Sequence, residues 1–427
     1  MILNILEKKN KYHGLQLSSY LFILIPFLLI TGPFLPDLSL VIIITLFTYS
    51  LIKSGKLIYF KNIYVYFFLT FFLCIIISLI NSEYAYIAYK PSLSYFRFGL
   101  FALATASILY FKNDIIVKLS KFFILILIVL GIDTFFQYIF GFNILGWQRL
   151  DNNFRITSLF GEDEVLGSYI ARFFPFILSL FLFSKKYYNK KYENFIIFLI
   201  ILLSGIICLF SGERTSFFLF LISILLILFT CHSIRKVFFR STLILIPVLL
   251  TLLFTDQKIK FRMYDFTIKQ LGFNSESKRI VIFSEIYEGH YKIAYKMFRE
   301  KPLTGHGVKS FREYCSKEEN FVAVNACTTH PHNIYMQLLA ETGIISFLLV
   351  ISIFILISIK LINISFNSLI KKNNKTEDYL TLIYIFYAVN LFPIAPSGNF
   401  FNNWMSIIYY LPSGYFIYLN NFKNARI

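Results

Sequence analysis

The chain has little charge for its length. Only 15% of its 427 residues are Asp, Glu, Lys or Arg, whereas 57% are hydrophobic and 52 are Phe. A soluble protein of this size cannot bury so much apolar surface, so this composition excludes an ordinary soluble domain and favours a polytopic membrane protein. The net charge of +18 comes from short basic clusters between apolar runs. Because no stretch combines Arg with regularly spaced aromatic residues, the charge does not indicate a nucleic-acid groove.

Cysteine is also scarce, and its spacing excludes a structural zinc site, so no metal and no cofactor are predicted. Cys74, Cys208 and Cys231 fall in or beside apolar runs and are expected to be packing residues. Cys315 and Cys327 lie in a long polar segment and form a disulfide candidate if that segment is outside the cytoplasm. Two free thiols are the alternative.

The sequence shows no internal repeat, no low-complexity tail and no small-residue cleavage site after its basic start. The first apolar segment is therefore expected to stay in the membrane. A bilayer-spanning helix needs about twenty apolar residues. On that criterion we predict an all-α protein with about twelve transmembrane helices, near residues 16–35, 38–53, 62–80, 93–111, 118–140, 166–184, 194–211, 214–231, 241–255, 333–361, 377–395 and 403–420.

Lysine clusters set the expected orientation. Every second connection between the predicted spans is short and basic, as the positive-inside rule requires of cytoplasmic loops. Both termini are then cytoplasmic, in a bacterial inner (cytoplasmic) membrane. The chain divides into spans one to nine over 1–255, a large outward (periplasmic) loop over 256–332, and spans ten to twelve over 333–427.

The outward loop is too long to be an unstructured turn. Residues 277–299 space their apolar side chains as an amphipathic helix does, and we expect this helix to lie on the membrane surface. Ser275 or Ser277 would cap it, which places Arg279 in its first turn near free backbone N–H groups that favour anions.

Arginines are distributed against the orientation rule. Nine of the twelve fall in outward loops or the outer halves of spans, whereas the inner loops use Lys. Arg binds phosphate oxygens in a bidentate manner, so this pattern predicts a phosphate on the outer face. Arg97, Arg172 and Arg214, in or at the mouth of apolar segments, are predicted to bind it. Ordinary solvation is expected for the loop arginines Arg149, Arg155, Arg262, Arg299 and Arg312.

Two polar turns stand at the mouths of predicted spans. Ser211–Ser216, SGERTS, is a tight outward turn from which Arg214 can point into the bundle; a salt bridge with Glu213 is the alternative. Gly161–Tyr169, GEDEVLGSY, carries three consecutive acidic residues before a span. We expect Glu162, Asp163 and Glu164 to favour the start of that helix, with a divalent cation as the alternative.

The run His330-Pro-His332-Asn333 opens the tenth span. At a helix start the dipole favours a neutral imidazole, which can accept a proton from an attacking hydroxyl. Asn333, Gln337 and Glu341 follow at intervals of four and share one face, so they must meet protein or a wet cavity rather than lipid. A histidine that only caps the helix is the alternative. Phe392–Trp404, FPIAPSGNFFNNW, suggests a structured outward turn, although this signal is weak alone.

These motifs resemble the O-antigen ligase family and its relatives, the O-antigen polymerases and bacterial protein O-oligosaccharyltransferases. The resemblance rests on SGERTS, on Gly305-His306-Gly307 with Phe311, and on HPHNIYMQLLAETG, in which His332-Asn333 precedes Gly343 by the family's interval. The key arginines of the family match Arg214 and Arg279, and its key histidine matches His332. Relatives often carry Trp where this chain has Phe283.

The resemblance implies transfer of a glycan from undecaprenyl diphosphate to an acceptor on the periplasmic side. We expect lipid A–core as the acceptor; a polymerase or a protein transferase of the same superfamily is the alternative. Arg214 and Arg279 would stabilise the leaving diphosphate, and His332 would be the base. Arg172, Arg97, Asn333, Gln337, Glu341 and His330 would bind substrate. A flippase for lipid-linked glycans is the alternative of another class, although such transporters usually show related halves.

Overall fold

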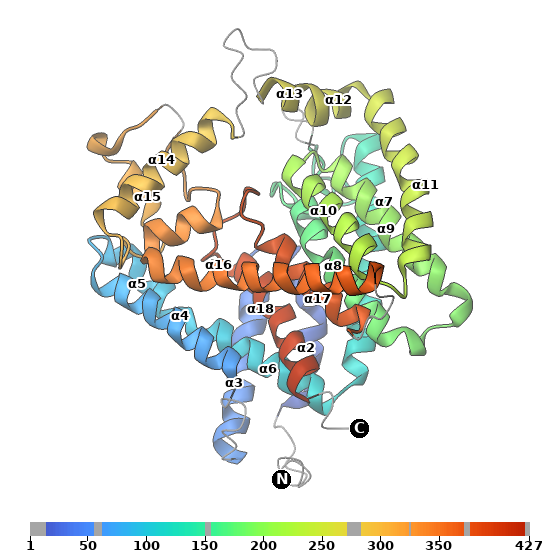
Figure 1. Ribbon diagram of the computed structural model, residues 1–427, viewed down its shortest axis with the longest axis horizontal. Helices are drawn as coiled ribbons and strands as arrows, with labels where there is room; N and C mark the ends of the chain where they lie inside the picture. Colours follow the sequence, from blue (N-terminus) through green and yellow to red (C-terminus); the bar gives the residue numbers. More distant parts are fainter. Residues whose placement is uncertain are drawn as a thin grey trace.

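The computed structural model describes residues 14–54, 62–149, 155–270, 283–323, 326–370 and 376–422 (Figure 1). In these residues all regular structure is helical, apart from an isolated bridge between Phe142 and Gln148. The predicted all-α class is confirmed.

Eight helical segments of the described residues are long and apolar enough to cross a membrane. They are α3 (Phe34–Ser54), α4 (Ile63–Ile80), α5 with α6 (Ala85–Ser94 and Phe96–Phe111), α7 (Asp114–Phe140), α8 (Leu166–Ser184), α9 (Glu193–Phe210), α11 (Arg235–Thr255) and α16 (Ile334–Leu369). The other four predicted spans coincide with shorter helices: α2 (Leu15–Leu28), α10 (Arg214–Thr230), α17 (Asp378–Asn390) and α18 (Asn403–Ile417). The total of twelve spans stays a prediction.

Helix α8 is the centre of the molecule. Nearly all of its residues are buried, between α7, α9, α10 and α17. Large aromatic side chains, among them Phe173, Phe174 and Phe176, fill this core. The N-terminal end of α8 opens into the cavity described below, so the most buried of the eight long helices carries part of the site.

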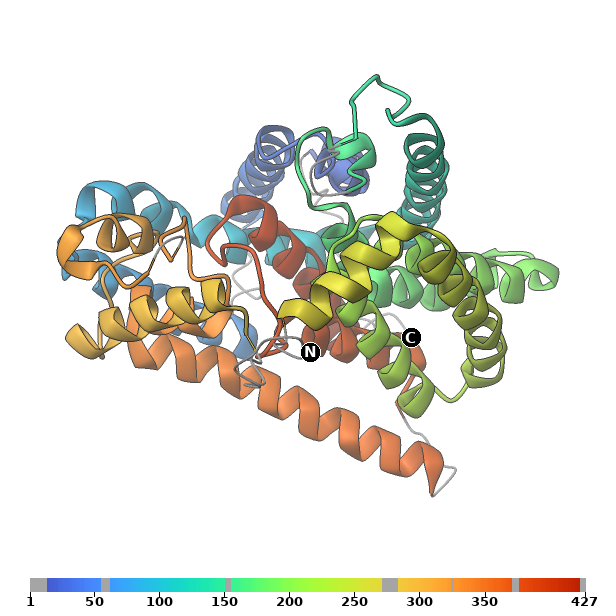
Figure 2. The same cartoon turned by 90° about the horizontal axis from the view of Figure 1, so that it is seen from above.

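Helix α16 is two helices joined at a break. Its long part runs along one side of the molecule in Figure 2. The whole of α16 runs for 36 residues, well beyond the roughly twenty that a bilayer requires. Gly343, with φ 78° and ψ −179°, interrupts it. The carbonyls of Ala340 and Glu341, freed by the break, accept hydrogen bonds from the N–H groups of His306 and Gly307. Residues Ile334–Thr342 therefore form a separate segment attached to the polar region between α11 and α16.

The close crossing at this break requires glycine. A Cβ atom on Gly343 would lie 2.2 Å from the carbonyl oxygen of Leu303, and one on Gly305 would lie 2.4 Å from the carbonyl carbon of Glu341. Both glycines have positive φ. The turn Gly305-His306-Gly307 is thus the segment that packs against the break in α16.

Helices α12 (Gln257–Lys260), α13 (Phe266–Gln270), α14 (Glu285–Glu300) and α15 (Phe311–Cys315) belong to the polar segment between α11 and α16 and gather along one edge of the molecule (Figure 1). Helix α14 begins at Glu285, later than predicted, and ends just before Lys301-Pro302. Ser275, Ser277 and Arg279 lie outside the described residues.

Helix α14 packs its apolar stripe on protein, and its expected position on the membrane surface stays a prediction. Its apolar stripe, including Ile293, Ala294 and Met297, is buried against Tyr314 of α15 and Ala340 of α16. The helix is amphipathic because it packs on protein, not because it packs on lipid. A disulfide between Cys315 and Cys327 closes the small core beside it.

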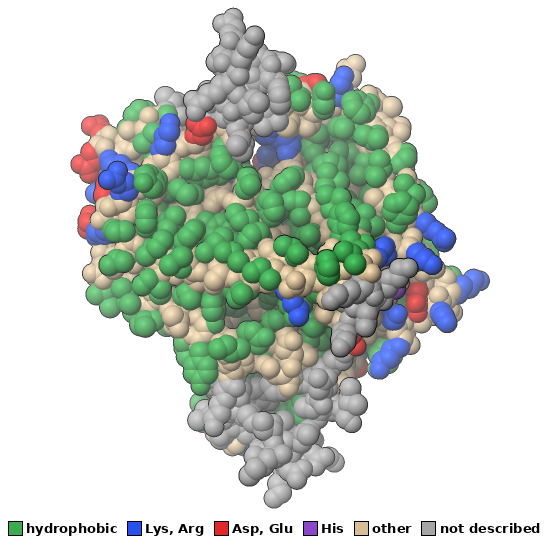
Figure 3. Space-filling view, viewed as in Figure 1, with side chains coloured by type: hydrophobic (Ala, Val, Ile, Leu, Met, Phe, Trp, Pro, Cys, Tyr) green, Lys and Arg blue, Asp and Glu red, His purple; other side chains and the backbone are tan. Residues whose placement is uncertain are grey.

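Apolar side chains cover the broad face of the molecule, whereas charged side chains gather toward its edges (Figure 3). One basic group on this face belongs to the corner between α8 and α9, where Lys185, Lys186, Lys190 and Lys191 stand. This distribution suits a bilayer around the apolar band.

Candidate active site

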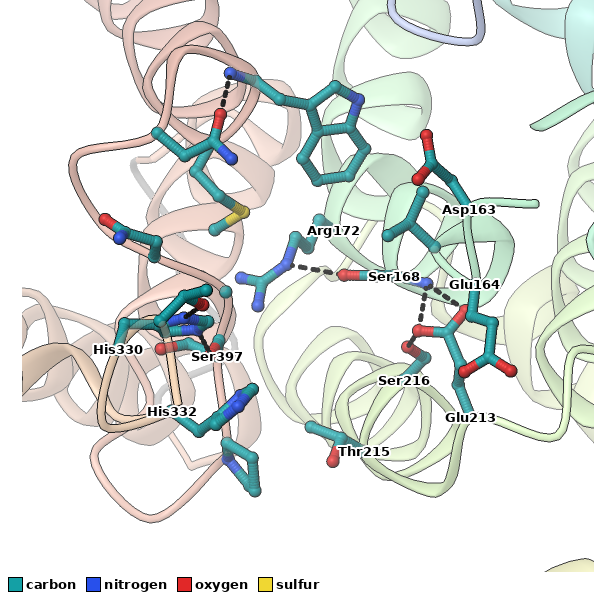
Figure 4. Close-up of a pocket in the computed structure, with 18 of the residues that line it drawn as sticks. Asp163, Glu164, Ser168, Arg172, Glu213, Thr215, Ser216, His330, His332 and Ser397 are labelled. Carbon is teal, nitrogen blue, oxygen red and sulfur yellow. Dashed lines mark hydrogen bonds between the residues drawn. The ribbon is translucent and has the colours of Figure 1, made fainter. Parts of the chain in front are cut away.

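A cavity of about 990 Å³ opens at the N-terminal ends of α8 and α10. Its walls come from segments far apart in the chain (Figure 4). One side is formed by Arg155–Arg172 and by the turn before α10, and the other by His330, His332 and the connection between α17 and α18. The predicted residues Arg172, Arg214, His330 and His332 all line it.

Arg172 occupies the middle of the cavity in Figure 4. It is 3% exposed, donates from Nε to Ser168 Oγ at 3.1 Å and from Nη1 to Asn390 Oδ1 at 3.0 Å. Among the described residues no carboxylate pairs with it. A buried guanidinium held only by neutral groups is costly unless an anion completes its solvation, so this position favours an anionic ligand.

A second group of guanidiniums stands at the mouth of the cavity. Arg214 and Arg262 both lie over the ring of Phe266, with Cζ atoms 4.9 and 5.6 Å from its centroid. Arg262 also donates from Nε to the Gly212 carbonyl at 3.2 Å, which attaches the segment after α12 to the SGERTS turn. Arg155 is the third member and is ion-paired with Glu164.

The three arginines feel one another's charge. Burial, together with the positive charges of Arg155 and Arg214, lowers the pKa of Arg262 to about 10, although Glu164 opposes the shift. Glu164 pairs with Arg155, whereas no carboxylate of the described residues forms an ion pair with Arg214 or Arg262. This arginine cluster (Arg155, Arg214 and Arg262) therefore has positive charge left over for a phosphate or diphosphate.

Glu213 lies on the same side of the cavity as the arginine cluster. Its carboxylate accepts hydrogen bonds from the N–H groups of Gly167 and Ser168 at 2.7 and 3.2 Å and from Ser216 Oγ at 2.9 Å. It thereby caps α8, a role that the sequence assigned to Glu162, Asp163 and Glu164. Burial raises the pKa of Glu213 to about 7. The predicted alternative of a salt bridge between Glu213 and Arg214 is not among the ion pairs of the described residues.

Three imidazoles lie together at the start of α16. The ring centroid of His332 is 4.1 Å from that of His330 and 5.4 Å from that of His290, and the Tyr287 ring lies 5.8 Å away. Burial, with a smaller contribution from neighbouring His290, lowers the pKa of His332 to about 4. Burial likewise lowers the pKa of His330 to about 3. Both rings are neutral at pH 7.

Both ring nitrogens of His330 form hydrogen bonds. His330 Nε2 donates to the Ser397 carbonyl at 3.2 Å, so its Nδ1 accepts from Thr329 Oγ1 at 2.9 Å. Both nitrogens of His330 are thus used within the protein, which suits a positioning residue. His332 has a positive φ of 54°, as does Lys309 on the same cavity at 64°. Such strain in non-glycine residues is tolerated where the surroundings enforce it and is common at functional sites.

Comparison with known proteins gives a family for the middle of the chain. Residues 198–351, from α9 into α16, match the sequence model of the family described as O-antigen ligase. Over these residues the chain is similar to the O-antigen ligase family. The resemblance seen in the sequence is thereby confirmed, and no curated protein matches the chain significantly.

The similarity to the O-antigen ligase family supports a membrane glycosyltransferase of the ligase superfamily, and with the apolar helices it makes the chain a multi-pass membrane protein. The matched region contains Arg214, Arg262 and His332. Arg172 and the connection between α17 and α18 complete the cavity from outside that region.

Four predicted substrate-binding residues do not line the cavity. Arg97 pairs with Asp37 at 3.0 Å and donates to Asn403 Oδ1 at 2.8 Å. Asn333 caps α16 and donates to the Pro393 carbonyl at 2.7 Å. Gln337 binds Glu341 and Asn399 at 3.0 and 2.9 Å. The polar stripe of α16 thus meets protein, as expected, but it supports the cavity wall from behind.

Several residues that line the cavity had no predicted role there. Arg155, Arg262 and Arg312 were expected to be ordinary solvated side chains, yet all three line the cavity. These three arginines would have been found if every arginine in the predicted outward loops had counted as a candidate for phosphate binding. No signal in the sequence pointed to Tyr287 or Lys309, which reach the cavity only through the packing of α14 and of the turn after Gly307.

Proposed function

We propose that this protein transfers a glycan from undecaprenyl diphosphate to lipid A–core on the periplasmic face of the inner membrane. One observation carries the proposal: Arg172, the arginine cluster and neutral His332 line a single cavity. Cationic groups for a leaving diphosphate and a base for an incoming hydroxyl are the two requirements of this reaction.

The donor binds with its diphosphate at the arginines. As the bond between the anomeric carbon and the diphosphate oxygen breaks, negative charge grows on the leaving undecaprenyl diphosphate. Fixed guanidiniums in a site of low dielectric stabilise this charge more in the transition state than in the ground state. Arg172 is rigidly held for this task by Ser168 and Asn390. Arg279, outside the described residues, would join this group by analogy with the family.

The acceptor hydroxyl attacks the anomeric carbon from the side opposite the diphosphate, forming the new glycosidic bond and inverting the centre. Its proton passes to His332, whose depressed pKa leaves the imidazole free to accept it. His330, with both nitrogens engaged, holds the backbone of the facing loop. The proton then leaves to solvent or to the released diphosphate.

The test is transfer by the purified full-length protein in detergent or liposomes. A defined undecaprenyl-diphosphate glycan is supplied with lipid A–core, with a second lipid-linked repeat, or with a Ser/Thr peptide, each with and without chelator. We expect a new glycosidic bond only with lipid A–core. Product with another acceptor would change the assignment within the superfamily. Movement of donor between leaflets without any new bond would support a flippase instead.

A further inference from the structure

The connection between α17 and α18 forms a wall of the cavity that the reaction scheme above leaves unused. Pro396, Ser397, Gly398, Asn399, Asn402 and Trp404 line the cavity from this connection. None of them is charged, in contrast to the arginine side of the same space. A wall of hydroxyl, amide and indole groups matches the chemistry of a sugar ring, which offers hydroxyls at its edges and apolar C–H groups on its faces.

Ser397 is fixed against the histidines by its backbone. Its N–H donates to the His332 carbonyl at 2.9 Å, and its carbonyl accepts from His330 Nε2 at 3.2 Å. Its backbone is also hydrogen-bonded to the ring of His332, which partly opposes the lowered pKa of that residue. The loop and the proposed base are therefore joined by hydrogen bonds, and Figure 4 shows Ser397 beside both histidines.

The side-chain hydroxyl of Ser397 takes no part in these backbone hydrogen bonds. The residue is 8% exposed, it lines the cavity, and its Oγ has no hydrogen-bond partner among the described residues. A buried hydroxyl without a partner costs free energy, so its retention at a cavity wall points to a ligand that supplies the partner.

The loop is supported from behind as a binding element would be. Gln337 donates to Asn399 Oδ1 at 2.9 Å and accepts from the Phe400 N–H at 2.9 Å. The Trp404 indole donates to the Leu29 carbonyl at 3.0 Å, which holds its ring at the cavity. These contacts fix the loop independently of the Ser397 hydroxyl, so removing that hydroxyl leaves the fold intact.

We propose that Ser397, with the wall formed by Asn399 and Trp404, is the subsite for the acceptor sugar, and that the Ser397 hydroxyl binds a sugar hydroxyl adjacent to the one that His332 deprotonates. This rests on the proposed function and deepens it: the acceptor is recognised as a glycan and not as a peptide. The donor diphosphate remains with the arginines across the cavity.

Binding is measured separately from transfer, so that the two proposals can fail independently. The chain has two Trp residues, and Trp147→Phe leaves Trp404 as the reporter of the cavity. In this background the full-length protein is titrated with delipidated core oligosaccharide and, separately, with undecaprenyl diphosphate that carries no glycan. Ser397→Ala and Ser397→Thr are compared with Ser204→Ala, a control serine on α9 that is also buried, has an unpartnered hydroxyl and does not line the cavity.

We expect Ser397→Ala to weaken oligosaccharide binding by roughly five- to tenfold, the value for one neutral hydrogen bond, with undecaprenyl diphosphate binding unchanged. Ser397→Thr, which keeps the hydroxyl, should restore binding, and Ser204→Ala should leave both titrations unchanged. In transfer assays the defect of Ser397→Ala should appear in KM for the acceptor.

Wild-type protein that binds oligosaccharide in this Ser397-dependent way but forms no glycosidic bond would support the subsite and refute the proposed function. Oligosaccharide binding that is absent, or equal in wild type and Ser397→Ala, would overturn the subsite even if transfer occurs. An equal loss of undecaprenyl diphosphate binding in Ser397→Ala would also overturn it, because the residue would then serve the donor.

Discussion

At the scale of single residues, the cavity separates charge from proton transfer. The guanidiniums carry permanent charge on one side, and burial keeps the imidazoles neutral on the other. The sequence argument for a neutral His332 relied on the helix dipole, whereas the structure attributes the lowered pKa mainly to burial. Burial depends on Tyr287, His290 and the facing loop, which are distant in sequence and could not have been placed from it.

The first prediction concerns pH. Because the pKa of His332 in the free protein is lowered to about 4, its imidazole stays deprotonated and able to act as a base down to that pH. We expect kcat/KM for transfer to stay level from neutral pH downward and to fall only below about pH 5, not near the ordinary histidine pKa of about 6.5. Initial rates in a series of constant-ionic-strength buffers measure this profile.

The second prediction tests the base itself. His332→Ala should lower kcat by roughly 10²- to 10⁴-fold, the contribution of general base catalysis, without changing the amount of folded protein. His232→Ala, an exposed histidine in the turn before α11, is the matched control and should transfer at the wild-type rate. Comparable activity in the two variants would remove His332 from the mechanism.

The third prediction tests the charged wall. Arg172→Gln, Arg214→Gln and Arg262→Gln should each reduce kcat/KM by about 100-fold or more, since each removes a fixed charge from the leaving diphosphate. Arg299→Gln on α14 is the control, because Arg299 is exposed and does not line the cavity. Arg262 is the sharpest of the three tests: full activity in that variant would show that a loop arginine near the cavity is only a solvated side chain, as the sequence suggested.

At the scale of elements, the break in α16 joins the outward loop to the membrane helix. The sequence predicted one long span because the helical pattern continues on both sides of Gly343. A single glycine within such a pattern does not by itself predict a break in the helix. The break is stabilised by the turn at Gly305, because the N–H groups of His306 and Gly307 donate hydrogen bonds to the helix carbonyls that the break leaves free. This is a tertiary contact, and helix periodicity carries no information about it.

The fourth prediction concerns this crossing. Gly343→Ala should destabilise the protein by about 1–3 kcal/mol from the forced positive φ alone, and by more from the clash with Leu303, so its melting temperature in detergent should fall clearly. Gly131→Ala on α7 is the control, because its nearest neighbour is the methyl end of Leu203 at 3.0 Å. Equal melting temperatures of the two variants would show that the segments around Gly343 and Leu303 need not approach so closely.

At the scale of the whole molecule, hydropathy located nearly every helix, since each of the twelve expected spans coincides with a helical segment. The polar elements were harder to predict. Helix α14 reads as a membrane-surface helix from its spacing alone, and only the position of Tyr314 and Ala340 shows that its apolar stripe is buried in protein. Likewise, Ser397 became a candidate only when the fold set its backbone against the histidines.

The fifth prediction tests the orientation of the chain. In intact cells, a membrane-impermeant maleimide should label Phe321→Cys in the outward loop but not Tyr187→Cys in the corner after α8, and permeabilisation should expose the second site. Both side chains are well exposed, at 67% and 58%, and the native free cysteines Cys74, Cys208 and Cys231 are buried, so background labelling should be low. The reverse labelling pattern would invert the proposed topology.

The mutual repulsion of Arg155, Arg214 and Arg262 has a consequence for handling the protein. Three like charges held together by the fold weaken it, and any small polyanion that settles among them relieves that tension in the native state alone. Inorganic pyrophosphate in the purification buffer should therefore act as a stabilising additive, and detergent extracts prepared in dilute, phosphate-free solution should age fastest.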